Sequence, residues 1–217
     1  MSLAISKRRG PIVKSDVQVA VIGGGIVGVS VLYWLAKQGW TDTVLLERRE
    51  LTSGSTWHAA GNTTYFGPFP KMTALFAGSI RTYLQAEKES GQSVGFHQTG
   101  SLRLAATERE LELFHVYAPR YAELGIPFHI RTPKEVADLH PFIDTASIYG
   151  AAHTPTDGHV DPTGATNALA LAARHLGASI ERHCPVGAIS KAAGKWVLET
   201  ENGTVTAEHV VVAASFW

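Results

Sequence analysis

The fold of this 217-residue chain is decided by the stretch from Asp16 to Gly61, which reads DVQVAVIGGGIVGVSVLYWLAKQGWTDTVLLERRELTSGSTWHAAG. Residues 17–22 are rich in β-branched side chains, which is typical of a fully buried parallel strand. Apolar residues then recur at helical spacing over 26–38, and Gly39 supplies a stop signal. Residues 44–47 predict a second buried strand. The stretch therefore predicts a β-α-β unit.

Three glycines, Gly23, Gly25 and Gly28, separate the first strand from the helix with the spacing GxGxxG. The first permits a tight turn, the second lets the backbone approach a pyrophosphate, and the third lets the helix pack close to the strand. Glu47 stands 19 residues after Gly28, at the end of the second strand, where a carboxylate can accept hydrogen bonds from a ribose. The spacing alone also fits an ordinary glycine-rich turn, but strand, helix and acid together predict a bound dinucleotide.

The charge balance excludes several classes of partner. Lysine and arginine together number 19, and so do aspartate and glutamate, so we expect neither nucleic acid nor a membrane surface as a partner. The longest apolar runs are far shorter than the roughly 20 residues that cross a bilayer. The composition, with 45% hydrophobic residues, predicts a sizeable core.

Cysteine use and the first residues bear on the compartment. Cys184 is the single cysteine, which excludes an internal disulfide and fits a reducing environment, and we interpret it as a small buried hydrophobe and not as a nucleophile. We predict a cytoplasmic protein. The basic, acid-free residues 1–15 also fit an organelle transit peptide, so the mitochondrial matrix is the alternative.

After Glu47 the chain does not enter another helix. Leu51–Gly61 is small, polar and punctuated by glycine, which favours a loop close to a ligand. This loop and the following Thr63–Phe66, with Val21–Gly28 and Glu47–Arg48, resemble the D-amino-acid-oxidase-like superfamily of flavoproteins. Within it, they resemble the dimethylglycine and sarcosine dehydrogenase group.

The resemblance implies that FAD is the cofactor, and it supplies the candidate contacts. These are the glycine turn, the end of the second strand, the loop and one later position: Gly23, Gly25, Ile26, Val27, Gly28, Glu47, Arg48, Gly54, Ser55, Thr56, Trp57, His58, Ala59, Ala60, Gly61, Asn62 and Val186. In the resembled group, the histidine matching His58 is bonded covalently to the 8α-methyl carbon of FAD. The alternative is that His58 hydrogen-bonds FAD or fills a turn.

The resemblance also implies the reaction. We expect an FAD-dependent oxidoreductase that oxidises the C–N bond of a small amine, an N-methylated amino acid such as dimethylglycine or sarcosine, with hydride transfer to the flavin and loss of the methyl group. The alternatives are another amino-acid oxidase of the superfamily and a non-catalytic flavin-binding subunit. Because members of the group continue well beyond position 217, we expect Trp217 to be the edge of a fragment that further residues or a second chain complete. No catalytic acid or base is assigned.

The rest of the chain predicts an α/β fold: a Rossmann-like FAD-binding domain with an inserted antiparallel sheet that belongs to a substrate domain. We predict an N-terminal extension over 1–15, the FAD-binding domain over 16–92 and 155–217, and part of the substrate domain over 93–154. The predicted helices span 72–90, 108–124, 133–139 and 162–176. Two predicted strands, 94–98 and 101–105, form a hairpin, and three more, 185–189, 195–200 and 204–205, form a meander. Single strands are predicted over 128–131, 147–153, 179–181 and 210–214.

A few further residues invite a functional interpretation. Asp161 precedes Pro162 at the start of a helix, which favours a helix cap over a catalytic role. The histidines are scattered without metal-ligand spacing, so we expect no metal. Tyr65 and Phe66 fit either a wall of the substrate site or simple packing.

Overall fold

The computed structural model describes residues 14–67 and 69–215. The chain divides into two compact units, which are treated separately below. Unit 1 comprises Met1–Ala59, Gln85–Val94 and Asp161–Trp217, and unit 2 comprises Ala60–Leu84 and Gly95–Val160. Most of the predicted N-terminal extension lies outside the described residues. The predicted domain boundaries stay a prediction, and the compact units differ from them over residues 60–84, 93–94 and 155–160.

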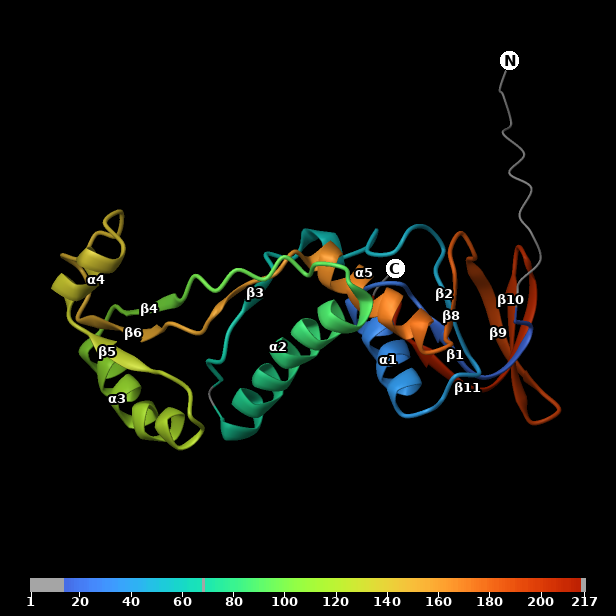
Figure 1. The fold of residues 1–217 in the computed structure, drawn as a ribbon, viewed down its shortest axis with the longest axis horizontal. Helices are drawn as coiled ribbons and strands as arrows, with labels where there is room; N and C mark the ends of the chain where they lie inside the picture. Colours follow the sequence, from blue (N-terminus) through green and yellow to red (C-terminus); the bar gives the residue numbers. More distant parts are fainter. Residues whose placement is uncertain (1–13, 68, 216–217) are drawn as a thin grey trace, which may run out of the picture. The chain divides into compact units, whose positions relative to one another are not determined.

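Unit 1 is built on a six-stranded sheet with the strand order β8-β2-β1-β11-β10-β9 (Figure 1). The strands are β1 (Asp16–Ile22), β2 (Thr43–Leu46), β8 (Ser179–Glu181), β9 (Val186–Ala192), β10 (Lys195–Thr200) and β11 (Gly203–Val212). The first four in the spatial order run parallel, and β11, β10 and β9 are joined as an antiparallel meander. The predicted β-α-β unit and meander are confirmed.

Two helices of unit 1 pack against each other, α1 (Ile26–Lys37) and α5 (Pro162–His175). The buried face of α5 is dominated by alanine, including Ala165, Ala168 and Ala172, whose small side chains let α1 approach closely. Asp161 caps α5, because its carboxylate accepts the N–H groups of Thr163 and Gly164 at 3.0 Å each. The interpretation of Asp161 as a helix cap is therefore confirmed.

Unit 2 contains a three-stranded antiparallel sheet with the order β4-β6-β5 and a small two-stranded sheet of β3 and β7. The strands are β3 (Asn62–Thr63), β4 (Ser101–Ala105), β5 (His129–Arg131), β6 (Gly150–Thr154) and β7 (Gly158–His159). Helices α3 (Glu108–Glu123) and α4 (Pro133–Leu139) both contact β6. Helix α2 (Pro70–Ser90) contributes its residues up to Leu84 to this unit.

The predicted hairpin of 94–98 with 101–105 is wrong. β4 pairs along its whole length with β6, and the earlier segment forms only an isolated bridge between His97 and His159. Gly95 and Gly100 both adopt positive φ, and the N–H of Gly100 is bonded to the carbonyl of Asp157 instead of closing a turn. The two glycines therefore bend the chain without reversing it.

Two predicted strands near the end of the sequence are one strand. β11 runs without interruption through 204–205 and on to Val212, pairing with β10 in its first half and with β1 over residues 206–212. Because one strand serves both neighbours, the meander and the parallel strands form a single sheet.

Candidate cofactor site

The glycine turn after β1 is closed by backbone on two sides. Gly23 has φ +111°, and a Cβ placed on it would lie 2.5 Å from the carbonyl oxygen of Ala213. A Cβ on Gly28 would lie 2.0 Å from the carbonyl oxygen of Gly23. These contacts involve backbone that cannot turn away, so both positions exclude every other residue type. The roles assigned to the first and third glycines of the motif therefore have a direct steric basis.

Gly24 is constrained as well, although the sequence spacing does not single it out. A Cβ there would meet Leu51 Cδ2 at 2.7 Å and Glu47 Cβ at 2.9 Å. Gly25 is less restricted, since its Cβ would meet only Thr56 Oγ1 at 3.0 Å. The loop after β2 therefore lies directly against the turn.

The N-terminus of α1 presents free N–H groups. Its N-cap is Gly25, which offers no side chain, and the N–H of Ile26 donates to Thr56 Oγ1 at 3.0 Å. The N–H groups of Val27 and Gly28 have no acceptor within the described part of the chain. Val27 is 63% exposed. Two donors at the positive end of a helix dipole can hold an anionic group such as a phosphate.

Glu47 is buried beneath the turn. Its Oε2 accepts the N–H of Gly24 at 2.6 Å, and its Oε1 accepts the N–H of Arg49 at 2.8 Å. An ionised carboxylate offers about four acceptor sites, so acceptor capacity remains for a ribose. Glu47 thus has a second task that spacing alone does not reveal, which is to fix the glycine turn against β2.

The loop after β2 ends in a short 3-10 helix, Thr56–His58. Thr56 is buried and bonds α1, whereas the next two side chains are exposed. The rings of Trp57 and His58 lie 3.9 Å apart between centroids. In the ranges that the structure describes, the imidazole of His58 has no hydrogen-bond partner. It is therefore available for reaction with a ligand.

The candidate contacts do not all come together. Gly54, Ser55 and Ala59 belong to the same loop of unit 1, and Arg48 follows Glu47 directly; Ala60, Gly61 and Asn62 belong to unit 2. Val186 begins β9, which β11 and β10 separate from β1. Its side chain packs against a core cluster that includes Ala20 of β1 and Leu46 of β2. The structure thus gathers the turn, Glu47 and the loop. Val186 begins the edge strand β9 two residues after Cys184, whose N–H donates to the carbonyl oxygen of Glu47 at 2.8 Å, and its contact with FAD stays a prediction.

Unit 2 has a buried carboxylate that the sequence did not reveal as important. Asp157 is 1% exposed and accepts hydrogen bonds from Thr64 Oγ1 at 2.7 Å, Ser101 Oγ at 2.6 Å and the N–H of Tyr65 at 2.8 Å. No sequence motif marks this arrangement, because the three donors come from two distant segments. Asp157 fixes the backbone at Tyr65.

Phe66 packs and does not line a free site. Its ring contacts the rings of Tyr121 and Phe128, and the guanidinium of Arg103 lies 3.9 Å from its centroid. Tyr65, by contrast, lines a cavity of unit 2. Packing is therefore confirmed for Phe66, whereas a wall of the substrate site stays a prediction for Tyr65.

None of the helices among the described residues is long and apolar enough to cross a membrane. Within 14–67 and 69–215, no group of three or more histidine, cysteine, aspartate or glutamate side chains is arranged to hold a metal ion.

Comparison with known proteins identifies the family. The model of the DAO family, described as FAD dependent oxidoreductase, matches residues 18–217. Dimethylglycine dehydrogenase of rat mitochondria is 42% identical over 205 residues, which are 94% of this chain and 24% of the relative. Human mitochondrial sarcosine dehydrogenase is 35% identical over 213 residues, covering 94% of this chain and 23% of the relative.

A solved structure, L-proline dehydrogenase from P. horikoshii, superposes with a TM-score of 0.84 at 29% identity, covering 94% of this chain and 54% of that chain. The chain spans about a quarter of the length of the curated relatives. The match to the family model and to both curated relatives runs through the glycine turn, Glu47 and the His58 loop. The chain belongs to the DAO family of FAD-dependent oxidoreductases.

Proposed function

We propose that this chain is the FAD-binding part of an oxidoreductase that oxidises the C–N bond of an N-methylated amino acid. The observation that carries the proposal is the 42% identity to dimethylglycine dehydrogenase over 94% of the chain. Sarcosine dehydrogenase, a relative named for another N-methylated glycine, supports the same substrate class.

The residues of unit 1 fit FAD. The backbone cradle at Gly23 and Gly28 has no room for a side chain, and the free N–H groups of Val27 and Gly28 suit a pyrophosphate. The remaining acceptor capacity of Glu47 suits a ribose hydroxyl. When bound, FAD supplies the acceptor for a hydride from the N-methyl carbon, after which hydrolysis of the iminium releases formaldehyde and the demethylated amine.

We further propose that a ring nitrogen of His58 would form a covalent bond to the 8α-methyl carbon of FAD. The 8α C–H bond would break with loss of a proton, and the electron pair would pass to the oxidised flavin and from there to an external electron acceptor such as dioxygen. The support is the exposed imidazole of His58, which has no hydrogen-bond partner in the described ranges, so a ring nitrogen is free to act as a nucleophile. Trp57 packs against the ring and limits its orientations. Thr56 anchors the loop to α1 and so restrains the backbone that carries the imidazole.

Mass spectrometry of the denatured protein tests the bond. We expect an FAD-sized adduct on the peptide containing His58, and its loss in His58→Ala. His115→Ala is the matched control, because His115 is an exposed histidine of α3 and belongs to another unit of the chain. A wild-type protein without the adduct, after expression with ample flavin, contradicts covalent attachment but leaves FAD binding standing.

Anaerobic flavin reduction tests the substrate class. We expect bleaching of the flavin absorbance by dimethylglycine or sarcosine, with release of formaldehyde. The alternative is another amino acid as substrate, and the likeness to L-proline dehydrogenase favours including L-proline in the panel. Reduction by L-proline without reduction by either N-methylated glycine overturns the proposal in favour of that alternative.

A flavin-loaded protein that no amine reduces favours the non-catalytic subunit, completed by a second chain. Such a partner, like the small amine itself, is an expectation from the resemblance. Co-purification of the natural protein under mild conditions distinguishes the cases, because a second chain would elute with it.

The compartment is also a proposal. Both curated relatives carry the word mitochondrial in their names, which supports the mitochondrial alternative and not the cytoplasmic prediction. Residues 1–13, which contain the basic cluster, lie outside the described residues. Cell fractionation with a tag at the other end of the protein tests the assignment.

A further inference from the structure

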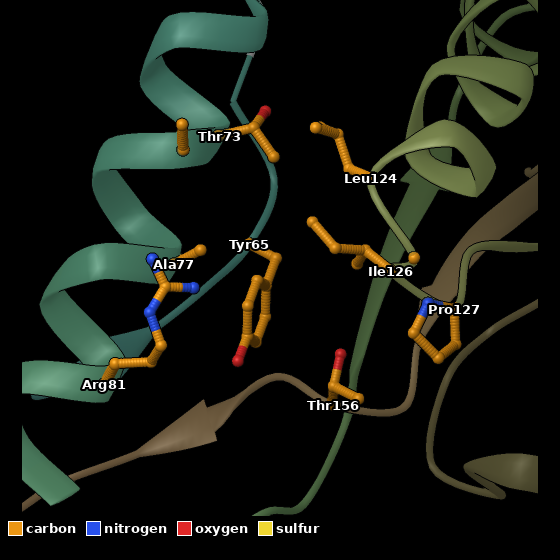
Figure 2. A pocket seen from close by; sticks show the side chains of 10 residues that line it. Tyr65, Thr73, Ala77, Arg81, Leu124, Ile126, Pro127 and Thr156 are labelled. Atoms are coloured by element: carbon orange, nitrogen blue, oxygen red, sulfur yellow. The ribbon is translucent and has the colours of Figure 1, made fainter.

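Unit 2 contains a cavity of about 410 Å³ that is separate from the glycine turn of unit 1. It lies between α2, the loop that follows α3, and the connection from β6 to β7 (Figure 2). Ala77, Leu124, Ile126 and Pro127 give it an apolar wall. Its volume suits a ligand of small-molecule size.

A single charged side chain lines this cavity, that of Arg81. Figure 2 shows it extending from α2 toward Tyr65. Across residues 14–67 and 69–215, the guanidinium of Arg81 forms no ion pair or hydrogen bond. Among the residues that the structure describes, no carboxylate lines the cavity. Because an arginine keeps its charge at physiological pH, the cavity has an uncompensated positive charge at one side.

Two hydroxyl groups face the same space. The Oγ1 atom of Thr156 is buried without a hydrogen-bond partner among the described residues, and Figure 2 shows it directed into the cavity. A buried polar atom without a partner costs about 1–3 kcal/mol, so a bound acceptor would remove a real penalty. Tyr65 lines the cavity too, and Asp157 fixes its backbone at 2.8 Å.

We propose that this cavity binds a small aliphatic monocarboxylate. Arg81 pairs with the carboxylate, the hydroxyls of Tyr65 and Thr156 donate to its oxygens, and the hydrocarbon chain lies against Leu124 and Ile126. A planar guanidinium matches a carboxylate with two parallel hydrogen bonds.

The same lining selects against amino acids. A zwitterion would bring an ammonium group close to Arg81, and no acidic side chain of the lining could compensate it. The ligand class therefore differs from the amine substrate proposed above, and this site goes beyond the oxidation reaction.

Three probes with one carbon skeleton test the proposal by calorimetric titration of the whole flavin-loaded protein: isovalerate, its neutral amide isovaleramide, and valine. We expect isovalerate to bind at least about tenfold more tightly than the other two, the loss expected when a charged hydrogen bond is removed. Equal affinity for isovalerate and isovaleramide overturns the proposal, and so does an absence of isovalerate binding.

Matched variants locate the site. Arg81→Gln should weaken isovalerate binding by at least about tenfold, and Thr156→Val by about threefold. Arg109→Gln is the control, because it removes the same charge from an exposed position of α3. Thr156→Val removes an unpartnered hydroxyl, so we expect it to fold as well as the wild type. Isovalerate affinity that Arg81→Gln leaves unchanged overturns the assignment, while flavin content and amine oxidation report separately on the proposed function.

Discussion

The hydroxyl of Thr56 accepts a hydrogen bond of 3.0 Å from the backbone N–H of Ile26, which is the first residue of α1. This bond ties the loop that carries His58 to the helix whose N-terminus faces the proposed pyrophosphate. It joins the two parts of the candidate site through atoms of the chain itself. The loop should therefore be positioned before FAD binds.

Replacing Thr56 with valine keeps the shape of the side chain and removes the acceptor. We expect the free energy of unfolding to fall by about 1 kcal/mol, as for other lost helix caps, and FAD to dissociate faster from non-covalent preparations. Thr56→Ser should behave as the wild type because it keeps the hydroxyl. Urea unfolding followed by circular dichroism measures the first effect, and a valine variant as stable as the wild type would show that the bond contributes nothing.

Replacing Gly28 with alanine should disrupt the turn. Its Cβ would lie 2.0 Å from the carbonyl oxygen of Gly23, so backbone must move, and we expect a loss of about 3 kcal/mol together with loss of bound flavin. Gly78→Ala is the control, since Gly78 lies inside α2 with no atom closer than 4.0 Å to the added carbon. That variant should gain about 0.5–1 kcal/mol from helix propensity. Denaturation midpoints and the ratio of flavin to protein absorbance report both effects.

Two aspartates four positions apart should respond differently to replacement by asparagine. Asp157 is surrounded by three donors, so an amide NH₂ would face another donor, and we expect Asp157→Asn to cost about 3 kcal/mol. Asp161 caps α5, and asparagine caps as well as aspartate, so Asp161→Asn should change stability by less than about 0.5 kcal/mol. Comparable losses in the two variants would contradict this account of Asp157.

The stability of unit 1 should depend on pH through Glu89. Burial raises the pKa of this carboxyl, but hydrogen bonds from Lys37, Gln85 and Tyr33 outweigh it and hold the pKa below its ordinary value. A depressed folded-state pKa contributes stability above the ordinary pKa of a glutamate, and this contribution is lost as the pH falls through the lowered value.

The variant Glu89→Gln isolates this contribution. At neutral pH it should cost about 1 kcal/mol, because the charged hydrogen bonds are replaced by neutral ones. Its unfolding midpoint should then fall less steeply than that of the wild type as the solution is acidified. Parallel pH profiles for the two proteins would exclude Glu89 as a source of the dependence.

The sequence predicts those segments whose hydrogen bonds join residues only a few positions apart. The strand, glycine turn and helix over 17–38 follow from adjacent residues, and so do the helix caps at Thr107, Thr132 and Asp161, each of which bonds N–H groups in the first turn of its helix. In these segments the hydrogen-bond partners lie within a few positions, so periodicity and capping residues suffice.

Contacts between segments that lie far apart in the sequence could not be predicted from such local patterns. The turn signal at Thr99 and Gly100 favoured a hairpin, but β4 pairs with β6 from some fifty positions later. The bonds of Glu47 to the N–H groups of Gly24 and Arg49 require β1 and β2 to be placed side by side first. The cavity around Arg81 likewise joins four segments, and no motif in the sequence marks it.

The contact between Gly23 and Ala213 links the beginning of the fold to residues 190 positions further along the chain. During translation, β1 and β2 emerge early, while β11, which covers the other edge of β1, is made only after all the other described strands. At about 5–20 residues per second, β1 waits roughly 10 to 40 s with an unpaired apolar edge. Nascent chains of this protein should therefore depend on chaperones over that interval, and FAD should be captured only after β11 has been synthesised.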